Sequence, residues 1–89
     1  MANSPQARKR ARQAIKRRLH NLSQKSEMRT AIKRVQKLIE NKELDKVSAA
    51  YQTAVKQIDI LAGRDLIHAN KAARLKSRLN ARVKAAAAA

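Results

Sequence analysis

Hydrophobic residues recur at intervals of three and four in three stretches of this chain. The stretches cover residues 28–39, 47–62 and 72–83, with short polar segments between them. Such spacing places apolar side chains on one face of a helix, which is typical of helices that pack together. The apolar positions are Met28, Ala31, Ile32, Val35, Leu38 and Ile39; then Val47, Ala50, Tyr51, Ala54, Val55, Ile58, Leu61 and Ala62; then Ala72, Leu75, Leu79 and Val83. The pattern predicts an all-α fold, an antiparallel three-helix bundle, with Tyr51 in its core.

The first helix is predicted to begin well before the first apolar stretch. Ser4 is suited to accept hydrogen bonds from the first turn, and Pro5 fits the first helical position. No Gly or Pro interrupts the following residues as far as Glu40. A continuous helix of roughly 36 residues is about 54 Å long, more than the rest of the chain can cover. We therefore expect the first helix to project from the bundle.

The two halves of this helix differ in character. Residues 1–26 hold eight Lys or Arg and no acid, and their large apolar residues are Ile15, Leu19 and Leu22. The apolar stripe changes phase between Leu22 and Met28, so we expect the first half to face a different partner. We predict a single domain, residues 1–89, with a basic arm (1–26), a bundle (27–84) and an Ala-rich tail (85–89) that extends the last helix or frays.

Several residues suggest where the helices end and begin. Asn41 is expected to cap the first helix in the left-handed conformation, and Asp45 is expected to cap the start of the second. Gly63, the only glycine, is placed to end the second helix. Either Asp65 or Asn70 could cap the third.

The chain carries a formal charge of +16 in 89 residues, and it has one Tyr and neither Trp nor Phe. Self-repulsion of this size favours a polyanionic partner. The charge is uneven, at +8 for residues 1–26, +3 for 27–39, −1 for 40–65 and +6 for 66–89. We infer that the first and third helices share an anion-facing side and that the second faces away.

Other classes of protein find little support in the sequence. His20 and His68 are far apart, and the chain has no glycine-rich phosphate loop, paired carboxylates or activated nucleophile. We expect no enzyme, cofactor, metal site or small-molecule substrate. Zero cysteines exclude disulfides and Cys-ligated zinc. An Arg-rich start also occurs in organelle transit peptides, but its continuity with the bundle helix argues against removal. With no secretion signal and no apolar span, we expect a cytoplasmic protein that does not bind a membrane.

Basic residues form rows along the predicted helices. The rows are Arg8, Arg12 and Lys16; Lys25, Arg29, Lys33 and Lys37; and Lys71, Arg74, Arg78 and Arg82. Arginine binds phosphate through two parallel hydrogen bonds, so these rows predict phosphate binding. With one aromatic residue, base stacking is not expected, and folded RNA would be bound through its shape and backbone. The alternative is a DNA-compacting polycation. A membrane-surface helix is disfavoured, because the first half lacks Trp, Phe and a wide apolar face.

Particular residues resemble one known family. They are the string IHANKAARLKSRL at residues 67–79, the pair His20 and Asn21, MRT at 28–30 followed by Ile32 and Lys33, and the opening MAN with ARKR at 7–10. Over essentially its whole length the chain resembles the bacterial small-subunit ribosomal protein S20 family. The resemblance implies a three-helix bundle that binds the 5′ domain of 16S ribosomal RNA in the 30S subunit and supports subunit assembly. We expect the free protein to be a monomer.

The basic rows and the resemblance together give a set of expected RNA-binding residues. They are Arg8, Lys9, Arg10, Arg12, Lys16, Arg17, Arg18, His20, Asn21, Lys25, Arg29, Lys33, His68, Asn70, Lys71, Arg74, Lys76 and Arg78. One departure from the family pattern concerns the second turn. Family members often carry glycine directly before the apolar pair that precedes His, whereas Arg64 and Asp65 separate Gly63 from Leu66 here.

Overall fold

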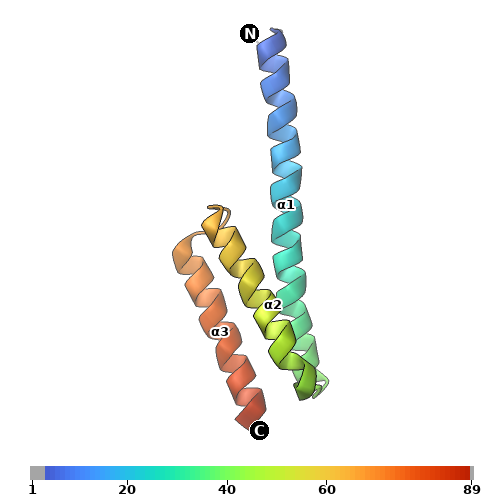
Figure 1. Cartoon of the computed structure of the whole chain (residues 1–89), viewed down its shortest axis with the longest axis vertical. Coiled ribbons are helices and arrows are strands. Elements are labelled where there is room, and N and C mark those ends of the chain that lie inside the picture. The colour runs from blue at the N-terminus through green and yellow to red at the C-terminus, as the bar shows by residue number, and fades with distance from the viewer. Residues whose placement is uncertain (1–3, 89) are drawn as a thin grey trace.

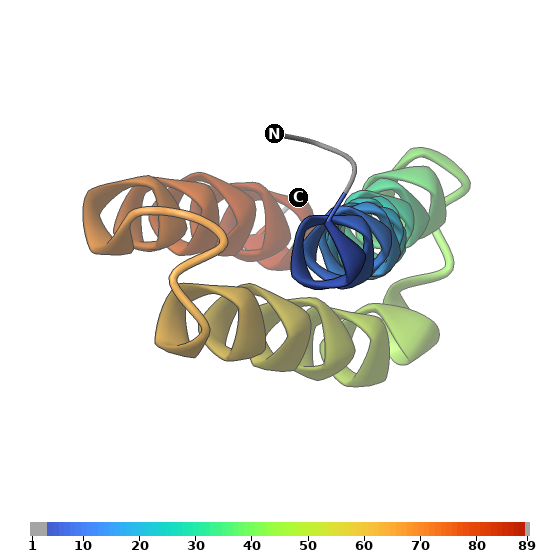
Figure 2. The ribbon, with the colours of Figure 1, turned by 90° about the horizontal axis from the view of Figure 1, so that it is seen from above.

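The computed structural model describes residues 4–88, which form three helices as predicted (Figure 1). They are α1 (Pro5–Glu40), α2 (Leu44–Gly63) and α3 (Ala69–Ala88). Successive helices run antiparallel, and α1 and α3 lie on the same side of α2 (Figure 2). The Cα atoms extend over 62 × 23 × 15 Å, because the first half of α1 projects beyond the bundle. The predicted fold class is confirmed.

Helix α1 begins where the sequence predicts. The Ser4 hydroxyl accepts a hydrogen bond from the Ala7 amide at 3.1 Å, and Pro5 occupies the first helical position. The helix then continues without interruption for 36 residues. The cap satisfies one of the amides that a helix start leaves without an intrahelical partner.

Helix α1 ends at Glu40 with Asn41 as its C-cap, but the left-handed residue lies one position later than predicted. Asn41 keeps a φ of −82°, and the left-handed residue is Lys42, with a φ of 58°. The Lys42 amide donates to the Ile39 carbonyl at 3.1 Å, and the Glu43 amide donates to the Leu38 carbonyl at 3.0 Å. This pair of bonds is the Schellman motif, in which the residue after the cap takes the left-handed conformation. Asn41 is therefore the cap as predicted, but its predicted left-handed conformation was wrong for that reason.

Helix α2 ends with the same motif. The Asp65 amide donates to Ala62 at 3.1 Å and the Leu66 amide to Leu61 at 2.9 Å. Asp65 has a φ of 59°, whereas Gly63 is the last helical residue and does not have a positive φ. The predicted position of the helix end at Gly63 is confirmed. The residue that needs conformational freedom, however, is Asp65, which directly precedes the apolar pair Leu66 and Ile67.

Asp45 does not cap α2 as expected. The helix begins at Leu44, with Glu43 in the cap position and no side-chain hydrogen bond there. Because the Schellman motif of α1 already uses residues 41–43, α2 follows at once and Asp45 falls within its first turn. Its carboxylate still lies near the positive end of the helix dipole, which is favourable.

Helix α3 begins after His68, so neither Asp65 nor Asn70 caps it. The Ala72 amide donates to the His68 carbonyl at 3.0 Å. The Asn70 amide donates to His68 Nδ1, also at 3.0 Å. The His68 imidazole therefore accepts a hydrogen bond from the first turn of α3, a role that the side chain of Asp65 or Asn70 was expected to have. At its other end α3 continues through the Ala-rich tail to Ala88, and Ala89 lies outside the described residues.

The core consists of two buried clusters that follow the predicted stripes. Near the α2–α3 turn lie Met28, Ile58, Leu61, Ile67 and Ala72; nearer the α1–α2 turn lie Val35, Leu38, Val47, Ala54 and Leu79. Except for Ile67 in the turn, every buried residue belongs to a predicted apolar stripe. Tyr51 is only partly buried, against the second cluster.

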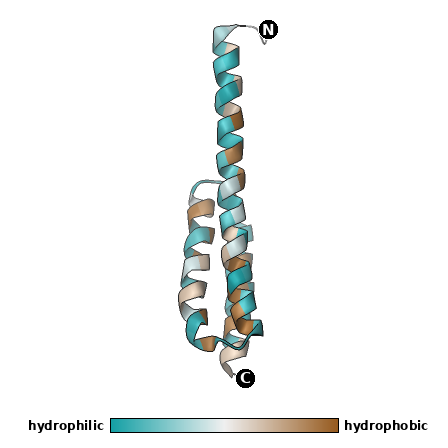
Figure 3. Cartoon of the chain, turned by 90° about the vertical axis from the view of Figure 1, so that its right-hand side faces the viewer, coloured by the Kyte–Doolittle hydropathy of each residue, from teal (hydrophilic) through white to brown (hydrophobic). Residues whose placement is uncertain are grey.

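No residue in the described part of the arm, residues 4–26, is buried. Ile15, Leu19 and Leu22 are 60%, 62% and 53% exposed. Figure 3 shows hydrophobic bands on the projecting part of α1. Residues 1–3 of the predicted arm lie outside the described residues.

Candidate nucleic-acid interface

A line of hollows runs between α1 and α3, on the side of the bundle opposite α2. One hollow of about 260 Å³, beside the start of α3, is lined by Lys25, Met28, Arg29, Leu66, Ile67, His68 and Lys71. The next, of about 480 Å³, is lined by Ile32, Gln36, Leu75, Arg78, Leu79, Ala81 and Arg82. A third, of about 400 Å³, is lined by Gln36, Ile39, Glu40, Arg82, Ala85 and Ala86. We call these hollows together the α1–α3 groove.

Cations border the α1–α3 groove along most of its length. Lys25 and Arg29 come from α1, and Lys71, Arg78 and Arg82 come from α3. All of them are exposed except Lys25, which is half-buried. The one acid that lines the groove lies at its far end, so a phosphate chain placed along the groove meets positive charge over most of its path.

The helices differ in charge as the sequence predicted. Helix α1 carries twelve Lys or Arg and two acids, and α3 carries six Lys or Arg and no acid. Helix α2 carries two of each and lies on the opposite side from the groove (Figure 2). The side shared by α1 and α3 is therefore strongly basic, and the side formed by α2 is neutral.

His68 has two roles at the edge of the groove. Because its Nδ1 accepts the Asn70 amide hydrogen, that nitrogen carries no proton in this bond. The ring proton of the neutral imidazole is then on Nε2. The ring lines the same hollow as Arg29 and Lys71. The cap thus leaves an N–H donor, suited to a phosphate or hydroxyl oxygen, on a residue that shares its hollow with three cations, Lys25, Arg29 and Lys71.

A side-chain hydrogen bond connects the α2–α3 turn to α1. Arg64 Nη1 donates to Gln24 Oε1 at 2.8 Å, where the arm leaves the bundle. Each of the two residues lies within two positions of a residue that lines the first hollow, Lys25 or Leu66. Neither residue could be predicted to form this contact, because a hydrogen bond between side chains forty positions apart leaves no local signal in the sequence.

Of the predicted residues in the bundle, Lys33, Asn70, Arg74 and Lys76 do not line the three hollows, and the structure directs Lys76 toward α2. Its Nζ lies 2.8 Å from Asp59 Oδ1 on α2, and both side chains are partly exposed. A surface pair of this kind contributes about 0–1 kcal/mol, but it directs Lys76 toward α2. Arg82, which lines the groove, was part of a predicted basic row but was not among the expected RNA-binding residues.

The remaining predicted residues are exposed or half-buried around α1 and α3. On the arm, Arg8, Lys9 and Arg10 are consecutive, as are Lys16, Arg17 and Arg18, and all six are exposed. Three consecutive helical residues span about 200° of the circumference. The arm is therefore basic on several sides, whereas the predicted bundle residues Arg29, His68, Lys71 and Arg78 line one groove, together with Lys25 at the end of the arm.

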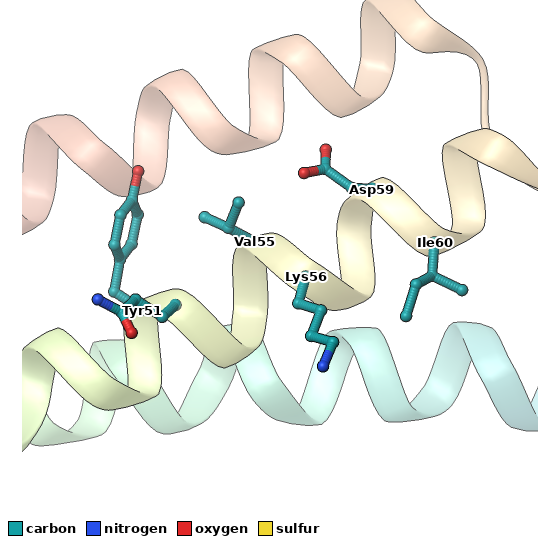
Figure 4. Close-up of a pocket in the computed structure, with 6 residues that line it drawn as sticks. Tyr51, Val55, Lys56, Asp59 and Ile60 are labelled. Atoms are coloured by element: carbon teal, nitrogen blue, oxygen red, sulfur yellow. The ribbon is translucent and has the colours of Figure 1, made fainter.

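A larger hollow, of about 530 Å³, lies on α2 (Figure 4). Its lining residues are Tyr51, Gln52, Val55, Lys56, Asp59 and Ile60. Tyr51 and Asp59 point toward α3 in this view. One cation and one acid give this lining no net charge, so it does not attract a polyanion. Within residues 4–88, no helix has the length and apolar content to cross a membrane, and no three potential ligand side chains cluster for a metal.

A small helical bundle with one basic groove, a basic arm and a neutral back has the features of a nucleic-acid-binding protein. The family model described as Ribosomal protein S20 matches residues 2–84. The chain is 60% identical over 85 residues to the small ribosomal subunit protein bS20 of Azotobacter vinelandii, covering 96% of this chain and 93% of that protein. It is 58% identical over 89 residues to bS20 of Pseudomonas fluorescens, covering 100% and 99%. The chain belongs to the ribosomal protein S20 family, which confirms the resemblance.

Proposed function

We propose that this protein is a structural component of the small ribosomal subunit that binds 16S ribosomal RNA directly, in its 5′ domain, and supports subunit assembly. Family membership supports the ribosomal role, since the relatives compared above are named as small-subunit proteins. In this proposal the protein is a monomer before it binds, acts in the cytoplasm and catalyses no reaction.

One observation carries the proposal of direct RNA binding. All 22 Lys and Arg lie within residues 4–88, where the structure has a single ion pair, between Lys76 and Asp59. The cations of the arm and the groove therefore have no carboxylate partner to displace before they bind phosphate. Binding would release the counterions condensed on RNA, which is the main electrostatic gain in such complexes.

The groove and the arm would have different tasks in this complex. The groove presents Arg29, Lys71 and Arg78 in one line, with the His68 donor at one end, and so suits one RNA backbone. The arm has cations on several sides and suits a position between RNA segments. Because phosphate contacts carry no sequence information, recognition would depend on the shape of folded RNA.

A salt series with a folded fragment of the 16S 5′ domain tests this proposal. With about eight phosphates contacted, the logarithm of the affinity should fall with a slope of roughly −6 to −7 against the logarithm of the salt concentration. Binding should survive competition by duplex DNA and by an unrelated folded RNA. A flat salt response would contradict direct phosphate binding, and equal loss to both competitors would contradict recognition of ribosomal RNA.

A further inference from the structure

The arm has an apolar stripe that nothing in the described structure covers. Ile15, Leu19 and Leu22 are all more than half exposed. At 3.6 residues per turn they lie within about 60° of the circumference of α1, so they form one narrow surface, which we call the arm stripe. Isolated exposed apolar residues are ordinary on protein surfaces, but three aligned on a projecting helix indicate a contact surface.

The arm stripe faces away from the side of α1 that packs in the bundle. Met28 follows Ile15 by thirteen residues and Val35 follows it by twenty, which places them about 220° and 200° around the helix. Both are buried against α2 and α3. Because α1 is continuous from Pro5 to Glu40, these angles hold along the rod. The bundle therefore cannot cover the stripe, and its partner must be another molecule.

Cations border the arm stripe on both sides. Taking Ile15 as the reference, Arg12 and Lys16 lie about 60–100° to one side, and Arg18 and Lys25 lie about 60–80° to the other. The described arm contains no acid. A complementary partner presents a surface of low charge between two lines of negative charge.

We propose that the arm stripe lies in the minor groove of double-helical RNA, with its methyl groups against the riboses; this inference rests on the proposed function. The minor groove of A-form RNA is wide and shallow and displays riboses and base edges. The two backbones that border it would meet the cations on either side of the stripe. The minor groove of B-form DNA is only about 6 Å wide, too narrow for a helix about 10 Å across. The stripe therefore fits the minor groove of duplex RNA and not the minor groove of duplex DNA.

Replacing the three stripe residues together with glutamine tests the assignment in the full-length protein. Glutamine favours helix and is uncharged, so the I15Q/L19Q/L22Q variant keeps every cation. Its affinity for the 16S 5′-domain fragment should fall roughly 10- to 100-fold, with an unchanged salt slope, because apolar contact is lost and phosphate contacts remain. The matched control is L44Q/I60Q, which changes two apolar residues of α2 that are 46% and 37% exposed. The control should bind as the wild type does.

Two further measurements identify the molecule that contacts the arm stripe. With labelled methyl groups, intermolecular nuclear Overhauser effects should connect Ile15, Leu19 and Leu22 to ribose H1′ protons, which lie in the minor groove. Sedimentation of the free protein should show a monomer with or without the substitutions. Wild-type affinity in the triple variant, or a dimer that the substitutions dissociate, would overturn the assignment while leaving the salt-dependent RNA binding of the wild type intact. If the wild type itself shows no salt-dependent binding to the RNA fragment, that result would contradict the proposed function as well.

Discussion

Replacing Asp65 with glycine should stabilise the free protein. Asp65 holds a φ of 59°, and the left-handed conformation costs a residue with a Cβ roughly 1–2 kcal/mol. Glycine has no such cost, although it increases the freedom of the unfolded chain by about 0.4–1 kcal/mol. The Schellman bonds of the turn come from the backbone and are retained. The net gain should be about 0.5–1 kcal/mol.

Gly63, two residues before Asp65, is a glycine at a position where the backbone does not require one. Gly63 lies in the last turn of α2 without a positive φ, and a Cβ added there would meet nothing within 4 Å. Alanine at that position should therefore gain about 0.5–1 kcal/mol from helix propensity. The G63A/D65G protein moves the glycine to the residue whose backbone requires it, and the two gains should add to about 1–2 kcal/mol.

Thermal unfolding followed by circular dichroism measures this gain. A domain of this size shifts its Tm by roughly 4–8 °C for each kcal/mol. At the other turn, Lys42→Gly should also stabilise, whereas Asn41→Gly should not, since Asn41 has a φ of −82°. A D65G protein no more stable than the wild type would refute the reasoning, because it would mean that the Asp65 side chain makes a contact that offsets its backbone cost.

Three other predictions follow from the interface. Replacing His68 with alanine removes the acceptor for the Asn70 amide and should destabilise the protein by about 1 kcal/mol in urea unfolding, while asparagine should restore the cap; no loss with alanine would contradict the capping role. Changing Arg29 and Lys71 together to glutamine should make the salt slope of RNA binding shallower by roughly 1.5–2, and the same change at Lys46 and Lys56 of α2 should leave it unaltered; equal effects would place RNA on both faces. Hydrogen exchange of the free protein should show less protection in the arm than in α2, because no buried residue holds the arm; equal protection would contradict this.

The helices and most of the core could be predicted from the sequence. Val35, Ile58 and Leu79 belong to apolar stripes that repeat at the helical period. A residue on the apolar face of a bundle helix is buried however the other helices are arranged. The start of α1 was predictable for a similar reason, since Ser4 and Pro5 act within one turn. Such features depend on contacts between residues close in sequence.

The helix ends and part of the interface required the structure. The left-handed residues are set by backbone bonds to Leu38 and Leu61, and the choice of Lys42 and Asp65 is not visible in residue type. Likewise, only packing shows that Lys76 faces α2. Which part of the protein a cation on a helix faces is known only once the neighbouring helices are placed.

The continuity of α1 has a consequence for the order in which contacts form. Starting a helix is costly and extending one is cheap, since each added residue fixes one set of dihedrals for one hydrogen bond. The half of α1 packed in the bundle is already a nucleus for the arm. The arm can therefore unwind and rewind from residue 27 outward without a new nucleation step. When it is fully wound, Arg8 lies about 32 Å along the axis from Arg29, so the helix rise sets the spacing between two binding surfaces. The arm then holds the two binding surfaces at a fixed separation, and it becomes rigid from its bundle end as the complex forms.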